Sequence, residues 1–183
     1  MMKPVMIKEH IEKLIPVLSE KEKQEISVFY RVYEKYADGF SEKMTGYLKA
    51  LPVCGKALGN IPDAVSVANG NLLRELQKAA ISKGNWLPYI EHQLERDMVY
   101  ARLGVDFKSW FDLNLLAKND ITPFLEQEYA GGETLFSALS GMNRLTDIAM
   151  TITGAAYLQE KEEIIRGFQV NIKKLTKEQE QKV

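Results

Sequence analysis

The stretch Tyr100-Ala101-Arg102-Leu103-Gly104-Val105 separates two expected helices and decides how the chain divides around it. The apolar pattern before it predicts a helix from Trp86 to Leu103. Gly104 is a natural left-handed residue for the position that follows a helix. A second helix is expected to start at Asp106, because aromatic and apolar residues follow it at helical spacing. The stretch is therefore a short corner between two helices.

Upstream of this corner, apolar residues again recur at helical spacing. Ser19 precedes Glu22 by three positions, a capping-box pattern that predicts the start of a helix. We expect Asp38-Gly39 to break or bend this helix. The other expected segments are a short helix before Pro16, a helix from Phe40 to Leu51, a weakly helical stretch from Pro52 to Pro62, and a helix from Asp63 to about Ser82.

Downstream of the corner, Gly131-Gly132 is the clearest turn, and from Glu133 one helical pattern continues to the end of the chain. No segment shows the sustained alternation of apolar and polar residues that marks a half-buried strand. Residues that favour helices dominate throughout. The sequence therefore predicts an all-α fold.

The last part of the chain carries a heptad pattern of the kind found in coiled coils. The residues that form its two a/d pairs are Ile165, Phe168, Ile172 and Leu175. We expect them to form a seam between the two parallel chains of a homodimer. The alternative is an amphipathic helix docked on its own domain. A globular helix rarely runs this far without a cap, which favours the seam.

Length and composition exclude several classes of protein. The 183 residues suit one domain, and 24 basic against 25 acidic residues give a net charge of −1. This balance argues against bulk attraction to nucleic acid or to an anionic membrane. The single cysteine, Cys54, excludes an intramolecular disulfide and fits a reducing compartment. No apolar run is long enough for a membrane span, so we expect a cytoplasmic protein.

Signatures of catalysis and of metal binding are missing from the sequence. It has no phosphate-binding loop, dinucleotide-binding glycine pattern, nucleophile elbow or zinc-protease motif. Neither His10 nor His92 has a glutamate three residues before it, which rejects a helical di-iron site. The acids beside His92, namely Glu91, Glu95 and Asp97, are expected on a solvated helix face. We therefore predict no catalytic residue and no metal site, and a protein that is not an enzyme.

The corner itself resembles the end of the proximal helix in sensor globins, the family of globin-coupled sensors and their haem-less relatives. Their pattern is His-x-Arg-x-Gly-aliphatic, followed by an aromatic helix, which Asp106–Phe111 supplies here. Asp38–Ser41 looks like the start of the family's second core helix, and Asp63–Ser82 like its distal-side helix. The resemblance spans roughly residues 20 to 160. It implies a globin-like fold that dimerises through its last two helices.

Two departures from the family concern haem. The family's haem-ligating histidine falls on Tyr100, and the tyrosine that faces bound gas would fall near Ser41. Both changes imply a haem-less sensor, like the amino-terminal domains of RsbR-type stressosome proteins. Some relatives of this kind hold an apolar ligand such as a fatty acid. Because phenolate can ligate ferric haem, a haem-based gas sensor remains the alternative.

The resemblance implies a sensory input domain with a pocket, or its filled remnant, between two helices. Leu72 marks the wall on the distal-side helix, and the residues expected to line the pocket are Phe40, Met44, Leu73, Leu76, Val99, Tyr100, Leu103 and Phe107. An apolar small molecule is the expected ligand. The alternative for Tyr100 is an ordinary core tyrosine. A helical adaptor module without any ligand is the alternative for the whole protein.

The expected organisation has three parts, in which the sensor domain occupies the middle. Residues 1–18 form an N-terminal helical extension, 19–157 the globin-like domain, and 158–183 a signalling helix that leads to an output module beyond residue 183. A ligand or partner would alter packing in the domain, and the helix pair of the dimer would carry the change to that downstream signalling module.

Overall fold

The computed structural model describes residues 11–52, 55–56 and 63–180, without the side chains at 63–68 and 175–180. Within these ranges the chain is helical and contains no strand, so the predicted all-α fold is confirmed. The long helices are α2 Glu20–Ala50, α4 Asp63–Lys83, α5 Trp86–Arg102, α6 Phe107–Tyr129 and α7 Gly132–Glu180. Of the expected extension 1–18, only residues 11–18 are described, and they hold a short helical turn.

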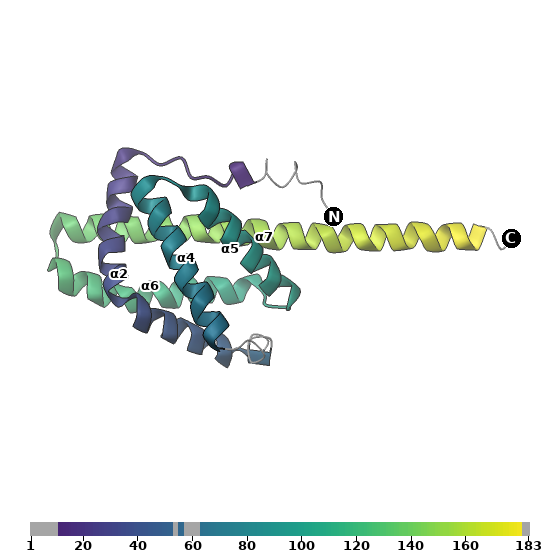
Figure 1. The fold of residues 1–183 in the computed structure, drawn as a ribbon, viewed down its shortest axis with the longest axis horizontal. Coiled ribbons are helices and arrows are strands. Elements are labelled where there is room, and N and C mark those ends of the chain that lie inside the picture. The colour runs from purple at the N-terminus through teal and green to yellow at the C-terminus, as the bar shows by residue number, and fades with distance from the viewer. Residues whose placement is uncertain (1–10, 53–54, 57–62, 181–183) are drawn as a thin grey trace.

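Helix α7 organises the molecule. It packs against α2, α5 and α6, while α4 packs on α5 and α2. Figure 1 shows α7 running along the whole length of the molecule and then projecting past the other helices as a single helix. Its 49 residues confirm the single helical pattern expected from Glu133 onward. One end of α7 is therefore part of the core, and the other end stands clear of it.

Helix α2 begins as predicted and continues further than predicted. The Ser19 amide donates to Glu22 Oε2 at 2.8 Å, and the Glu22 amide donates to Ser19 Oγ at 3.3 Å, which completes the capping box. The helix is not broken at Asp38-Gly39, because α2 is one helix of 31 residues, although Figure 1 shows that it bends along its length. A glycine inside a helix costs only about 0.5–1 kcal/mol relative to alanine.

Aromatic packing on both sides of Gly39 offsets that cost. The Tyr36 ring lies 4.2 Å from the Phe124 ring of α6, measured between centroids. The Phe40 ring stands edge-on to Tyr33 at 5.6 Å. Aromatic pairs in such geometries contribute about 0.5–1.5 kcal/mol beyond the area that they bury. Tertiary contacts therefore hold α2 continuous where local propensity predicts a break.

Two glycine turns define the helix order. Gly104 has a φ of 85°, in the left-handed region that its position after α5 predicts. At the α6–α7 turn, Gly131 and Gly132 have φ values of 92° and 79°. Residues with a Cβ rarely adopt these values. Both turns are thus corners between helices, and Gly84, with a φ of 70°, lies at another corner between α4 and α5.

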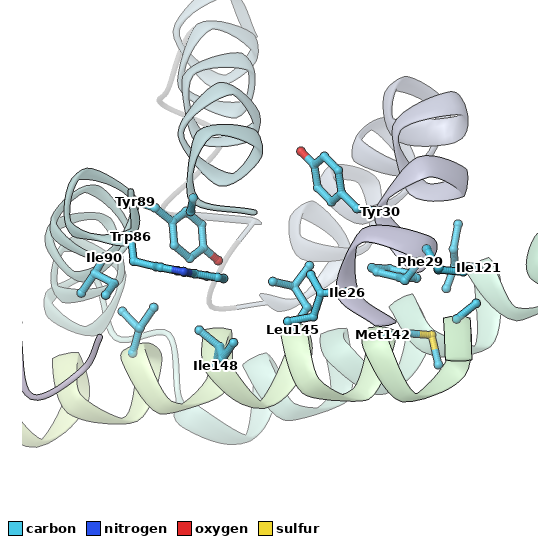
Figure 2. Close-up of a cluster of buried hydrophobic side chains, with 14 of the residues drawn as sticks. Ile26, Phe29, Tyr30, Trp86, Tyr89, Ile90, Ile121, Met142, Leu145 and Ile148 are labelled. Atoms are coloured by element: carbon cyan, nitrogen blue, oxygen red, sulfur yellow. The ribbon is translucent and has the colours of Figure 1, made fainter. Parts of the chain in front are cut away.

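Helices α2 and α7 cross closely at Gly141. A Cβ atom at this position would lie 2.1 Å from the Glu25 carbonyl oxygen of α2, so only glycine allows this approach. Around the crossing, one continuous core unites α2, α5, α6 and α7. Figure 2 shows Trp86, Tyr89 and Ile90 at one end of this core, Ile26 and Leu145 near its middle, and Phe29, Ile121 and Met142 at the other end.

Candidate functional site

Tyr100, the residue at the position of the family's haem ligand, lies in a compact aromatic cluster. We call this the corner cluster; it comprises Tyr100, Val105, Trp110, Leu113 and Tyr157, with side chains from the end of α2 packed against it. The Tyr100 ring lies 5.3 Å from the Trp110 ring, between centroids. The Tyr100 side chain is partly buried. The resemblance also implies an inward-facing position for it.

Hydrogen bonds fix the geometry of the corner cluster. The Trp110 Nε1 group donates to the Tyr157 hydroxyl oxygen at 2.8 Å. The same hydroxyl donates to the Val105 carbonyl oxygen at 2.6 Å. Tyr157 belongs to α7, Val105 to the turn and Trp110 to α6. The corner that the sequence singles out is therefore bonded directly to α7.

A buried ion pair lies one turn before Tyr100 on α5. Asp97 is fully buried, and its Oδ1 atom accepts from Arg96 Nε at 3.0 Å and from Arg96 Nη2 at 2.9 Å. Its Oδ2 atom accepts from Thr153 Oγ1 of α7 at 2.6 Å. The expectation of a solvated face is thus wrong for Asp97, because α5 turns this carboxylate inward against α7. Nothing in the local sequence distinguishes Asp97 from the exposed acids beside it.

Arg96 is the electrostatic centre of this region. Its guanidinium carbon lies 5.7 Å from the centroid of the Trp110 ring. Burial by itself would lower the pKa of Arg96, but the adjacent Asp97 carboxylate raises it above its usual range. Burial raises the pKa of Tyr33 and of Tyr89, and the positive charge of Arg96 opposes part of that shift. Both phenols are consequently neutral at physiological pH, and the guanidinium is charged.

A second ion pair joins the end of α5 to α7. Arg102 Nε lies 2.7 Å from Glu160 Oε2, and Arg102 Nη2 lies 3.5 Å from Glu163 Oε2. The Glu160 side chain is largely buried by this contact. Arg102 therefore connects α5 to the part of α7 where the helix leaves the core. The Asp97–Thr153 hydrogen bond and the Arg102–Glu160 ion pair are thus two polar links between α5 and α7.

The structure separates the eight predicted pocket residues into three groups. Tyr100 belongs to the corner cluster, and Met44 packs against it. Phe40, Leu73 and Leu76 pack against the main core. The exposed members are Val99, Leu103 and Phe107, together with the wall residue Leu72.

The expected grouping of these residues around one pocket is thereby corrected. The physical reason is the rotation of α5: its buried face runs from Trp86 through Ile90 to Asp97, which leaves Val99 and Leu103 outside. Leu103 is 43% exposed and Val99 is 49% exposed. Periodicity gives the width of a buried face, but it does not fix which residues lie at its edge. Ligand binding by this chain stays a prediction.

A small cleft lies elsewhere, among α2, α4, α6 and α7. Its volume is about 140 Å³. The residues that line it are Phe29, Tyr33, Phe40, Gln77, Asn114, Ala117, Lys118, Ile121, Met142, Leu145, Thr146 and Ala149. Phe40 alone of these was among the predicted pocket residues. The sequence gives no signal for the others, because Ala117 and Ala149 leave space only once the helices are packed.

An apolar face lies on the outside of α6 and α7. Phe107, Phe111 and Leu115 follow one another at four-residue spacing along α6, and all three are exposed. Beside them, a groove of about 560 Å³ runs along α7 past Gly154 and Leu158. Monomeric proteins rarely expose contiguous apolar patches larger than a few hundred Å².

The predicted seam continues this outer face along the projecting part of α7. Ile165 is 56% exposed, Phe168 64% and Ile172 62%. The side chain of Leu175, the fourth predicted seam residue, lies outside the described residues. The three described residues therefore form an exposed apolar row along α7.

The arrangement of these helices is similar to that of a known protein. The globin domain of a globin-coupled sensor from Geobacter sulfurreducens matches it with a TM-score of 0.61. The chain has a globin fold. The match covers 86% of this chain and 99% of the other, at 14% sequence identity, so it shows the fold alone. No family model and no curated protein sequence matches the chain.

The described part of this globin fold lacks two features. Among the residues described, no group of three or more histidine, cysteine, aspartate or glutamate side chains could hold a metal ion. In the same part of the chain, no helix is both long and apolar enough to cross a membrane. The features that remain for a function are the corner cluster, the buried ion pair, the cleft and the outer face of α6 and α7.

Proposed function

We propose that this chain is the sensory input domain of a signal-transduction protein, that it works without haem, and that it relays a signal through a dimer of its C-terminal helices. It carries no catalytic activity of its own in this proposal. The observation that supports this proposal most directly is that α7 belongs both to the core and to the projecting helix. Its first part packs against α2, α5 and α6, and its last part projects with the exposed row Ile165, Phe168 and Ile172.

Helix α7 provides the mechanical connection that such a relay needs. Asp97 and Arg102 of α5 bond to Thr153 and Glu160 of α7. A change of packing at the corner cluster therefore acts on α7 just before the helix leaves the core. An allosteric mechanism needs an element with two arrangements that both sites can bias. In this proposal the element is the rotation of α7 in the dimer seam.

The surroundings of Tyr100 support the absence of haem. A haem at this place would need a ligand that faces an open space, and cofactor pockets in proteins have volumes of about 300–1,000 Å³. The Tyr100 ring instead packs against Trp110 inside the corner cluster. The groove of about 560 Å³ that borders this cluster is lined by Val105, Phe107 and Tyr157, and Tyr100 is not part of its wall. This packing supports the proposal that the domain works without haem.

The outer face supports the homodimer. Phe107, Phe111 and Leu115 of α6 and the seam residues of α7 lie along the last two helices, and two copies that pack there would cover both sets. A parallel arrangement brings both C-terminal ends to one place, as a paired downstream signalling module requires. The seam is too short to be stable alone. It therefore depends on the α6–α7 contact behind it.

Native mass spectrometry of the freshly purified chain tests this proposal. We expect a dimer that carries no haem. A mass increase of one haem per protomer would replace the proposal with a haem-based gas sensor. A monomer without any ligand would favour the adaptor module. The experiment also reveals any small molecule retained from the cell.

A further inference from the structure

The cleft among α2, α4, α6 and α7 has mostly apolar walls. Phe29, Ile121, Met142 and Leu145 supply much of its surface, and Figure 2 shows Phe29, Ile121 and Met142 gathered at this end of the core. The cleft is partly open to solvent, so a small molecule has a path into it.

Three polar residues of the wall direct side-chain hydrogen bonds into the protein, and Lys118 adds one charged side chain to the wall. Asn114 Nδ2 donates to the Trp110 carbonyl oxygen at 2.8 Å. Thr146 Oγ1 donates to the Met142 carbonyl oxygen at 2.8 Å. Gln77 Nε2 contacts the Tyr89 hydroxyl at 3.5 Å. A ligand in the cleft therefore has little need to supply polar groups, and its recognition rests on shape and apolar contact.

The volume limits the size of such a ligand. An engineered protein cavity of about 150 Å³ with aliphatic and aromatic walls stays dry and binds benzene or xenon. The cleft here has about 140 Å³, and most of its wall is apolar, although Gln77, Asn114, Lys118 and Thr146 also line it. A molecule with a long chain or with a fused ring system exceeds this volume.

We propose that the cleft binds a compact, uncharged apolar molecule of about the size of benzene. The site lies among α2, α4, α6 and α7, and it shares only Phe40 with the predicted pocket between α4 and α5. The inference rests on the proposed function, because the bound molecule would be the sensed ligand. Met142, Leu145, Thr146 and Ala149 form the α7 wall of the cleft, so an occupant presses directly on the helix that carries the dimer seam.

Titration of the whole chain with benzene, followed by methyl NMR, tests the proposal. We expect saturable shifts at the methyl groups of Ile121, Met142 and Leu145, and none at Val17, which is 92% exposed and lies outside the cleft. Xenon should perturb the same core methyl groups, and this measurement needs no variant. The absence of saturable shifts with both probes would overturn the inference.

Filling the cleft provides the matched comparison. Ala117→Leu places a larger side chain in the α6 wall, and Ala149→Leu does so from α7. Each should weaken benzene binding at least tenfold. Asn119→Leu makes a similar change at an exposed position of α6 and should bind like the unmodified chain. Unchanged affinity in a folded Ala117→Leu or Ala149→Leu protein would contradict the proposed location.

Lys118 at the wall permits a check of the ligand class. Benzoate has the same ring as benzene and adds a negative charge. We expect benzoate to bind more weakly than benzene, and tighter binding of benzoate would overturn the assignment to an uncharged ligand. Sedimentation of the same samples separates the two proposals. A dimer without benzene binding leaves the relay standing and removes this site.

Discussion

At the scale of single residues, Asp97 is the least expected feature of the structure. Its side chain is fully buried, one turn from Tyr100, and its two carboxylate oxygens accept hydrogen bonds from Arg96 and Thr153. Burying a charge pair stabilises a protein little by itself, but removing one partner leaves the other charge unpaired. The residue therefore holds α5 and α7 in one relative position.

We expect Asp97→Asn to destabilise the chain by about 3 kcal/mol, the low end of the cost for breaking a buried pair, because the Arg96 side chain keeps 25% of its exposure. Urea unfolding followed by circular dichroism measures this loss. Asp112→Asn removes the partner of Lys108 on the surface and should cost less than about 1 kcal/mol. Equal losses in the two variants would refute the structural role of Asp97.

Tyr100 carries the prediction about haem. Its ring is packed against Trp110, so addition of haemin to the protein should produce no one-to-one complex with a sharp Soret band. The measurement is an absorption titration of the unmodified chain beside Tyr100→Phe. Stoichiometric uptake with a ligand band that disappears in Tyr100→Phe would mean that the phenolate binds iron.

At the scale of the elements, the crossing of α2 and α7 depends on one glycine. Gly141→Ala would place a methyl group 2.1 Å from the Glu25 carbonyl oxygen, and the backbones must then separate. Overpacking of this kind costs about 1–3 kcal/mol.

Gly39→Ala is the matched control for that crossing, because no atom lies within 4 Å of its added Cβ. Since Gly39 is inside α2, alanine should stabilise this variant by about 0.5–1 kcal/mol. The midpoint temperature of thermal unfolding should therefore fall in Gly141→Ala and rise in Gly39→Ala. A destabilised Gly39→Ala protein would contradict a continuous α2.

The same two helices show what the sequence can predict and what it cannot. Ser19 with Glu22 and Gly104 act within one turn of the chain, so local pattern places them correctly. The continuity of α2 through Gly39 depends on Tyr36 against Phe124, a contact between distant segments. The rotation of α5 likewise depends on the hydrogen bond between Asp97 of α5 and Thr153 of α7, which are also distant in the sequence. The fold class was therefore predictable, and the grouping of Val99 and Leu103 around a pocket was not.

At the scale of the whole molecule, the account depends on the exposed apolar row of α7. Replacement of Ile165 and Ile172 by glutamate should shift the dimer to monomer at tens of micromolar, while each domain keeps its helical circular dichroism. Val170→Glu is the matched control, because Val170 is 62% exposed but lies off the seam. Dissociation by Val170→Glu to the same degree would show that the charge, and not the seam, is responsible.

Sedimentation equilibrium of the unmodified chain tests the central claim most directly. The relay requires two copies joined along α6 and α7, so the account predicts a single species with about twice the chain mass of 20.8 kDa at tens of micromolar. A monomer under the same conditions would contradict it.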